Sequence, residues 1–181
     1  MEDHWNTHYS RAIENQLDVV HLPFVHKTTI GRGSKTLVNG PVVKWNENRM
    51  TFYVKNEQDE GQRPEKPNEI ADYEKLFHLQ FQMPNIWQNI ISDKVRIFAV
   101  FAPVDEENTR IYLRFYQSFL RVPVLKELVG ALSNVSNRII FHQDRRVVLT
   151  QLPKKSEFRM KENLVQGDLP ILEYRKRREQ L

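Results

Sequence analysis

The sequence predicts an α+β fold in which an antiparallel sheet packs against a long C-terminal helix. Three observations support this prediction: a helical pattern comes first, strand patterns follow one another with only turn residues between them, and a long helical run comes last. The short gaps between the strands leave no room for crossover helices, so an antiparallel meander is expected. The 181 residues are enough for one domain with a hydrophobic core.

The first predicted helix covers residues 10–21. Ile13, Leu17 and Val20 recur at helical spacing, and Ser10 is a suitable N-terminal cap. Pro23 follows, and proline disfavours the helical conformation in the residue before it. The helix should therefore end, kink or restart near this point, and a restart would carry His26 about one turn further on.

The middle of the chain predicts strands. Residues 41–55 read as a hairpin with its turn at 46–48, because both arms are rich in β-branched and aromatic residues. The polar segment 56–75 contains two prolines and is interpreted as a surface loop or a lid. Four further strands are expected at 76–83, 86–91, 94–104 and 109–119.

A second, longer helix is predicted over residues 123–149, because no turn residue interrupts this run. Apolar residues at helical spacing form a broad stripe that we expect to lie across the sheet. The stripe consists of Val124, Leu125, Leu128, Val129, Leu132, Val135, Ile139 and Ile140.

Composition narrows the classes of function. The chain contains no cysteine, which excludes disulfides, thiolate zinc sites, cysteine nucleophiles and cysteine-held clusters, so any metal must be bound by nitrogen and oxygen. No apolar run could span a bilayer and no signal peptide is recognisable, so a soluble cytoplasmic protein is expected. The net charge of +4 comes largely from residues 173–181, which should solvate a terminal helix, and nucleic-acid binding is not expected.

Two of the six histidines have an unusual environment. A single histidine is more often a surface or core residue than a metal ligand. Asn15, Asp18 and His21, however, are three residues apart and would share one helix face, with apolar residues between them and before His26. This pattern favours a buried site that needs polar groups. Asp18 beside His21 is also the usual arrangement for orienting a metal-bound imidazole.

Asp144 is the candidate for a third ligand. Two histidines and one carboxylate occupy one face of an iron ion and leave the other positions open for oxygen and substrate. Asp144 lies late in the second predicted helix. Taken alone, an aspartate in a helix is more often a solvated charge, so this assignment depends on the histidine pair.

These residues resemble those of a known family. Asn15, Asp18, His21 and His26 match the pattern Asn-x-x-Asp-x-x-His-x-x-x-x-His around the iron of Rieske non-heme iron oxygenases, in the catalytic domain of the alpha subunit. Residues 143–151 resemble the second motif of the family, whose aspartate corresponds to Asp144, and residues 87–117 resemble the strands between the motifs. The resemblance covers roughly residues 5–175 and is closest to monooxygenases and O-demethylases.

The resemblance implies a function and a fold. Mononuclear Fe(II) would be held by His21, His26 and Asp144, and would use O2 to hydroxylate or O-demethylate an aromatic or other apolar substrate. Asp18 would connect the iron to its electron donor, and Asn15 would be a nearby polar group of the catalytic site. The implied fold is a helix-grip (Bet v 1/START-like) arrangement, with the substrate between the sheet and the long helix. Its proposed wall residues are Phe24, Phe98 and Phe101.

The resemblance also implies partners. Electrons would come from a [2Fe-2S] cluster held by two cysteines and two histidines, supplied in the family's trimers by the neighbouring subunit and fed by a reductase. This chain has no cysteine. We therefore expect residues 1–181 to form a single iron domain without the N-terminal Rieske domain, working in a homotrimer with a cluster on another domain or chain.

Two other functions fit parts of the pattern. A non-catalytic helix-grip module could bind an apolar ligand, with the histidines as relics, but this leaves the spacing of the polar residues unexplained. A hydrolytic zinc or iron enzyme could use the same ligands. No additional glutamate or histidine stands out in the sequence as its general base.

Overall fold

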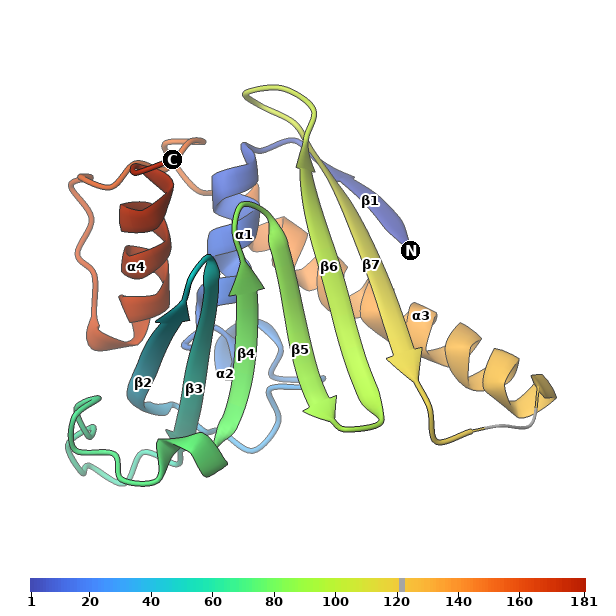
Figure 1. Cartoon of the computed structure of the whole chain (residues 1–181), viewed down its shortest axis with the longest axis horizontal. Coiled ribbons are helices and arrows are strands. Elements are labelled where there is room, and N and C mark those ends of the chain that lie inside the picture. The colour runs from blue at the N-terminus through green and yellow to red at the C-terminus, as the bar shows by residue number, and fades with distance from the viewer. Residues whose placement is uncertain (121–122) are drawn as a thin grey trace.

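A seven-stranded antiparallel sheet forms the centre of the structure (Figure 1). The computed structural model describes residues 1–120 and 123–181, and it describes the backbone but not the side chains of residues 123–126 and 128. The strand order is β1-β7-β6-β5-β4-β3-β2. The strands are β1 (Glu2–Trp5), β2 (Leu37–Asn46), β3 (Arg49–Glu57), β4 (Phe77–Gln82), β5 (Ile86–Ser92), β6 (Val95–Pro103) and β7 (Thr109–Gln117).

The predicted meander is confirmed, because β2 to β6 each pair with the next strand along the chain. The hairpin turn lies at Glu47 and Asn48, where Glu47 has a positive φ of 53°. Strand β1 was not predicted. It runs antiparallel to β7, from Glu2 opposite Tyr112 to Trp5 opposite Thr109. Its sequence, EDHW, has no apolar alternation from which a strand could be inferred.

The described residues also form four α-helices: α1 (Tyr9–Leu17), α2 (Leu22–Val25), α3 (Pro123–Val148) and α4 (Leu169–Arg178), with short 3-10 turns η1 (Tyr73–Lys75) and η2 (Gln166–Asp168). Among the described residues, no helix is long and apolar enough to cross a membrane. The side chain that caps α1 is His8, whose Nδ1 accepts from the backbone N–H of Ser10, so the expected cap at Ser10 was wrong.

Helix α1 is shorter than predicted. It ends at Leu17, and Asp18 already has an extended backbone. The Asp18 carboxylate accepts hydrogen bonds from the backbone N–H groups of Val20 at 2.7 Å and His21 at 3.2 Å. Such local bonds compete with helical ones. The chain restarts as the single turn α2, with Pro23 near its start. Asn15, Asp18 and His21 therefore do not form a stripe on one helix.

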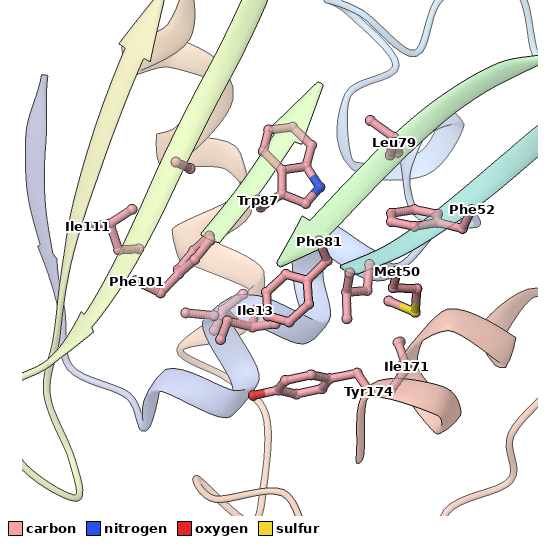
Figure 2. Packing of buried hydrophobic residues seen from close by; sticks show 14 of the residues in the cluster. Ile13, Met50, Phe52, Leu79, Phe81, Trp87, Phe101, Ile111, Ile171 and Tyr174 are labelled. Carbon is pink, nitrogen blue, oxygen red and sulfur yellow. The ribbon is translucent and has the colours of Figure 1, made fainter. Parts of the chain in front are cut away.

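The hydrophobic core lies on one face of the sheet (Figure 2). Alternate residues of the strands, among them Phe52, Phe81 and Phe101, point to this face and are fully buried. Helix α1 covers it with Ile13, and α4 covers it with Tyr174, whose ring meets Phe81 edge-on at 5.3 Å. The core thus fixes α1 against the sheet, and the chain leaving α1 enters the candidate site.

Helix α3 has the predicted extent but buries a different face. Of the predicted stripe, Leu132, Val135 and Ile139 are more than half exposed, and the side chains of Val124, Leu125 and Leu128 lie outside the described residues. In Figure 1 the N-terminal half of α3 extends beyond β7, away from the sheet. The buried positions, spaced by four, three and four residues and hence on one face, are Asn137, Phe141, Asp144 and Val148.

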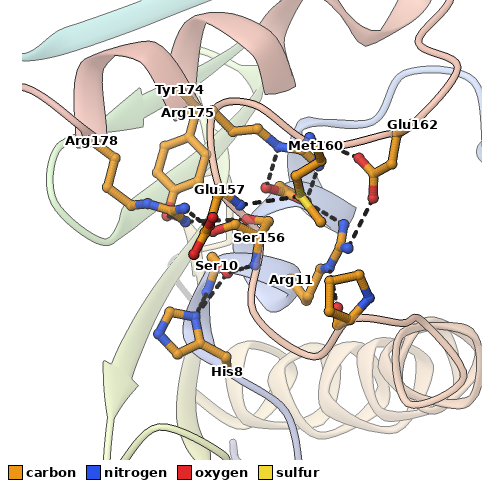
Figure 3. A network of polar contacts seen from close by, with 12 residues as sticks. His8, Ser10, Arg11, Ser156, Glu157, Met160, Glu162, Tyr174, Arg175 and Arg178 are labelled. Atoms are coloured by element: carbon orange, nitrogen blue, oxygen red, sulfur yellow. Dashed lines mark hydrogen bonds and ion pairs between the residues drawn. The ribbon is translucent and has the colours of Figure 1, made fainter.

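Three buried charged residues and the partly exposed Glu162 form a network between α1, α4 and the segment before α4 (Figure 3). Glu14 accepts from Arg11 at 3.0 Å and from two nitrogens of Arg175 at 2.8 and 2.9 Å. Glu162 accepts from Arg11 at 2.9 Å and from Arg175 at 2.7 Å. Arg175 therefore does not solvate a terminal helix, as its basic neighbourhood suggested, but holds α4 to α1.

Candidate metal centre

Three ligating atoms converge where α2 meets α3. His21 and His26 flank the single turn of α2, and Asp144 comes from the buried face of α3. One potential ligand atom from each residue lies within 4.8 Å of the others. Asp144 Oδ1 is 2.9 Å from His26 Nε2 and 3.5 Å from His21 Nε2. His26 and Asp144 are buried, and His21 is partly exposed.

The short helix α2 determines how the two imidazoles are presented. Its N–H groups bond back to His21, and the N–H of His26 donates to the carbonyl of Leu22 at 3.0 Å. Gly31 then packs against the same turn and donates to the carbonyl of His26 at 3.0 Å. A Cβ at position 31 would lie 1.9 Å from the Leu22 carbonyl oxygen. Only glycine fits this approach, which holds the histidine-bearing turn in place.

Each histidine is oriented through its Nδ1 atom. His21 Nδ1 donates to the backbone carbonyl of Asp18 at 2.9 Å, and His26 Nδ1 donates to Gln143 Oε1 at 2.8 Å. The sequence predicted that the Asp18 side chain orients His21. The Asp18 carboxylate is 3.7 Å from His21 Nδ1, however, and the backbone carbonyl of Asp18 accepts the hydrogen bond instead. Gln143 was not assigned a role. The only indication of this role in the sequence was that Gln143 directly precedes the predicted ligand Asp144.

The donor set fits a divalent metal. With hydrogen on both Nδ1 atoms, a neutral His21 and a neutral His26 direct their Nε2 lone pairs toward Asp144. Asp144 Oδ1 is buried and has no hydrogen-bond partner among the described residues. Two imidazole nitrogens and a carboxylate oxygen are ligands of non-heme Fe(II) and also of zinc. A bound cation would satisfy all three atoms at once.

Asp144 also acts on the pKa of His26. Burial by itself lowers the pKa of the His26 imidazole. In the protonated imidazole, however, Nε2–H would donate to Asp144, and this bond, the negative charge of Asp144 and the bond to Gln143 together raise the pKa above its ordinary value. A proton on His26 therefore competes with a metal for the same carboxylate.

An apolar cavity of about 290 Å³ opens beside these three residues. Its walls come from β4 to β7, α2, the loop after α2, and α3. The apolar lining residues are Leu22, Ile30, Phe77, Leu79, Trp87, Ile91, Ile97, Leu113, Ile140 and Phe141. The polar ones outside the triad are Gln16, Asp18, Asn89 and Asn137. None of the residues of the predicted lid, 56–75, lines the cavity.

The three predicted wall residues lie elsewhere, so that prediction needs correction. Phe24 is 59% exposed, because α2 turns it outward while the histidines flanking the turn face Asp144. Phe101 is fully buried in the core. Phe98 lines a different depression, at the ends of β5 to β7. Its neighbour Ile97 lines the cavity, and strand alternation sends the two side chains to opposite faces.

The two predicted polar catalytic residues have different positions. Asp18 lines the cavity and is partly exposed. Asn15 is buried on α1 and does not line the cavity, and its Nδ2 has no hydrogen-bond partner among the described residues. The roles of Asn15 and Asp18 stay predictions. The sequence analysis did not predict that the amides of Gln16, Asn89 and Asn137 line the cavity. Their positions within apolar stretches could have indicated it.

The model of one protein family matches nearly the whole chain. Residues 5–181 match the vanillate O-demethylase oxygenase C-terminal domain. The chain belongs to this family. The predicted resemblance to the catalytic domain of Rieske non-heme iron oxygenases, closest to the O-demethylase type, is therefore confirmed, and with it the oxidoreductase class at the level of the family.

Solved structures of Rieske oxygenases share the fold of this domain. NdmA of Pseudomonas putida CBB5 has a TM-score of 0.72 and 20% identity, over 97% of this chain and 46% of that one. The quaternary ammonium Rieske monooxygenase CntA, in complex with L-carnitine, has a TM-score of 0.62 and 15% identity, over 99% and 47%. This vanillate O-demethylase-type domain thus spans about half the length of these proteins. No curated protein matches its sequence.

Proposed function

We propose that this chain is the mononuclear iron domain of a Rieske-type oxygenase, with His21, His26 and Asp144 holding Fe(II). The proposed reaction is O2-dependent hydroxylation or O-demethylation of an apolar or aromatic small molecule. The observation that carries the proposal is the convergence of three ligating atoms, one of them the unpartnered Asp144 Oδ1, beside an apolar cavity. Membership of the family supports it.

The side chains around the centre have separate tasks. A bound iron would supply the activation of O2. Gln143 and the Asp18 carbonyl hold the imidazoles with Nε2 facing the metal position. Asp144 offsets part of the metal's charge. The apolar walls, including Leu79 and Phe141, exclude water and hold the substrate next to the centre. The cavity between the sheet and α3 is consistent with a helix-grip use of the fold.

The electrons must come from outside these residues. A [2Fe-2S] cluster of the Rieske type needs cysteine ligands, and this chain contains none. We propose that the cluster lies on another domain or chain, is supplied by a reductase, and approaches the iron at the partly exposed Asp18. A homotrimer would bring such a cluster from a neighbouring subunit. This chain spans about half the length of the solved relatives.

Metal content tests the proposal directly. Protein loaded anaerobically with Fe(II) and desalted should retain about one iron per chain, as expected for a single three-ligand site. His21→Ala and Asp144→Ala should lose it. His142→Ala is the matched control, because His142 is exposed on the same helix two residues before Asp144. Iron retained by His21→Ala and Asp144→Ala, or absent from the unmodified chain, would contradict the site and favour the non-catalytic binding module.

A second measurement separates the oxygenase from a hydrolytic metal enzyme. The iron-loaded domain should consume O2 only when a reduced Rieske-type donor and a substrate are both present. Turnover of an ester or amide by the zinc-loaded chain, without any electron donor, would instead support hydrolysis.

A further inference from the structure

One face of the long helix α3 is apolar and exposed. Leu132, Val135 and Ile139 are 62%, 61% and 52% exposed, and we call these three residues the α3 seam. Their spacing of three and four residues is that of the two apolar positions of a heptad, which form the contact between paired helices. In the sequence, Leu125 and Leu128 continue the same spacing toward the start of the helix. A narrow stripe of this kind is typical of a helix that packs on one other helix.

The α3 seam points away from the candidate metal centre. The opposite face of α3 carries Asn137, Phe141 and Asp144, which are buried against the rest of the chain. Residues 137 and 139 are two positions apart, which is about 200° around a helix. A partner helix can therefore contact the α3 seam without displacing the ligand Asp144.

The part of α3 that carries the seam receives little support from its own chain. Figure 1 shows the N-terminal half of α3 extending beyond β7, away from the sheet. Residues 131, 132, 134, 135 and 136 are all exposed. Most helical stability in proteins comes from packing one face of the helix against another element. A second helix on the α3 seam would supply this packing, and it would meet a helix whose nucleation is already complete.

The α3 seam matches a second copy of itself. Its residues are uncharged, and so are Ala131 and Ser136, which flank Leu132 and Val135. A strongly acidic or basic partner helix would leave its own charges unpaired against these residues. An identical helix instead presents the same apolar stripe, and a contact made by the same patch on both copies is that of a two-fold dimer.

The charges of α3 favour antiparallel pairing. In the sequence, the charges of Lys126 and Glu127 cancel in the first half of the helix. The second half is basic and carries the exposed Arg138 and Arg146. Parallel pairing would place two basic halves side by side, and like charges at this separation are destabilising. Antiparallel pairing places the basic half of each helix beside the uncharged half of the other, and it also opposes the two helix dipoles.

We propose that two copies of this chain associate through the α3 seam, with the two helices antiparallel and related by a two-fold axis. The contact covers only a few helical turns of each copy, which is less than the roughly 1,200 Å² at which standard interfaces begin. Association is therefore weak, with an expected dissociation constant of about 1 to 100 μM. The surface is separate from the metal centre, so the association does not depend on bound iron.

Sedimentation velocity of the full chain tests the association. Over concentrations from about 1 to about 500 μM, the sedimenting species should change from one chain to twice that mass. Leu132→Glu and Val135→Glu each place a charge in the seam, and each should raise the dissociation constant at least about 30-fold. Asn134→Glu is the matched control. It adds the same charge at an exposed position beside the seam and should associate like the unmodified chain.

Because all three substituted side chains are exposed, the variants should fold and bind Fe(II) like the unmodified chain. Circular dichroism and iron content check this. Retained iron with lost association would separate the role of the seam from that of the metal centre.

A distance measurement tests the orientation. The chain contains no cysteine, so Thr150→Cys, just after α3, carries a single spin label. In an antiparallel pair the two labels should lie more than about 35 Å apart, because each helical residue adds 1.5 Å. In a parallel pair they would lie within about 25 Å, since paired helix axes are about 8–10 Å apart.

Three outcomes would overturn the proposal. One is a chain that remains monomeric up to about 500 μM. Another is an assembly that persists in the folded Leu132→Glu and Val135→Glu variants, including a cyclic trimer, which is built from head-to-tail contacts. The third is a short distance between the labels, which would show that the helices are parallel.

Discussion

His26 Nδ1 and Gln143 Oε1 are joined by a hydrogen bond of 2.8 Å, which links the one-turn helix α2 to the long helix α3. Gln143 is the residue directly before Asp144, so one turn of α3 both presents the carboxylate and orients an imidazole that faces it. Thr29 donates to the same Gln143 oxygen at 3.1 Å and fixes its direction. Two of the three candidate ligands are thus positioned by neighbouring residues of a single helix.

Gln143→Leu should weaken Fe(II) binding by about 10-fold to 100-fold, because the imidazole loses the acceptor that orients it. A competition titration with a chelator measures the dissociation constant. Gln143→Glu keeps an acceptor of the same length and should bind Fe(II) much closer to the unmodified chain. Equal affinities of the Leu variant and the unmodified chain would show that packing alone orients His26.

Gly31→Ala should disturb the site from a distance. The added Cβ would lie 1.9 Å from the Leu22 carbonyl oxygen, so the α2 turn must shift, and overpacking of this kind costs about 1–3 kcal/mol. Both the free energy of unfolding, measured in urea, and the affinity for Fe(II) should fall. Gly130→Ala is the control: its Cβ would meet nothing within 4 Å on α3, and alanine is the better helix former. A Gly31→Ala variant with unchanged metal affinity would mean that α2 tolerates the shift.

Strands β2 to β7 could be predicted from sequence because each carries its own local pattern, which β1 lacks. Strands such as β7 alternate strictly between buried and exposed positions, from Thr109 and Ile111 on the core face to Arg110 and Tyr112 on the other. The end of α1 could not be predicted in this way. The Asp18 carboxylate accepts hydrogen bonds from backbone N–H groups that would otherwise bond within the helix. The spacing of apolar residues gives no information on this competition.

The cavity walls were harder to predict than the metal-facing residues. His21, His26 and Asp144 form a recognisable motif, and the structure brings them together. The wall residues were chosen by aromatic type, which does not tell a core position such as Phe101 from a cavity position such as Phe141. The same difficulty affected α3, where apolar Leu132 is exposed while polar Asn137 is buried. On α3 the face that borders the site is buried although it carries polar residues, so the usual rule that apolar residues mark the buried face fails there.

Glu162 should make stability depend on pH in the acid range. Burial alone raises the pKa of its carboxyl, but the hydrogen bonds and charges of Arg175 and Arg11 outweigh this and lower the pKa below the ordinary 4.5. A lowered pKa stabilises the folded state at pH above the unfolded value, and the contribution is lost as the pH falls through the folded value. The difference in unfolding free energy between the unmodified chain and Glu162→Gln should therefore shrink between about pH 6 and pH 3. A constant difference would show that the ion pairs do not depend on the charge of Glu162.

Arg175→Gln should destabilise the fold more than any exposed charge substitution on α4. The guanidinium is 3% exposed and makes two hydrogen bonds to Glu14, so its removal leaves a buried carboxylate paired only with Arg11. Breaking a buried ion pair in this way typically costs about 3–5 kcal/mol.

Lys176→Gln is the control for Arg175→Gln, because Lys176 is the next residue on α4 and is exposed. It should change the free energy of unfolding by less than about 0.5 kcal/mol. Helix α1 leads through Asp18 to His21, so the folded fraction of Arg175→Gln should still bind Fe(II) if the network only supports the fold. A loss of iron from protein that remains folded would instead show that the α1–α4 network positions the metal site itself.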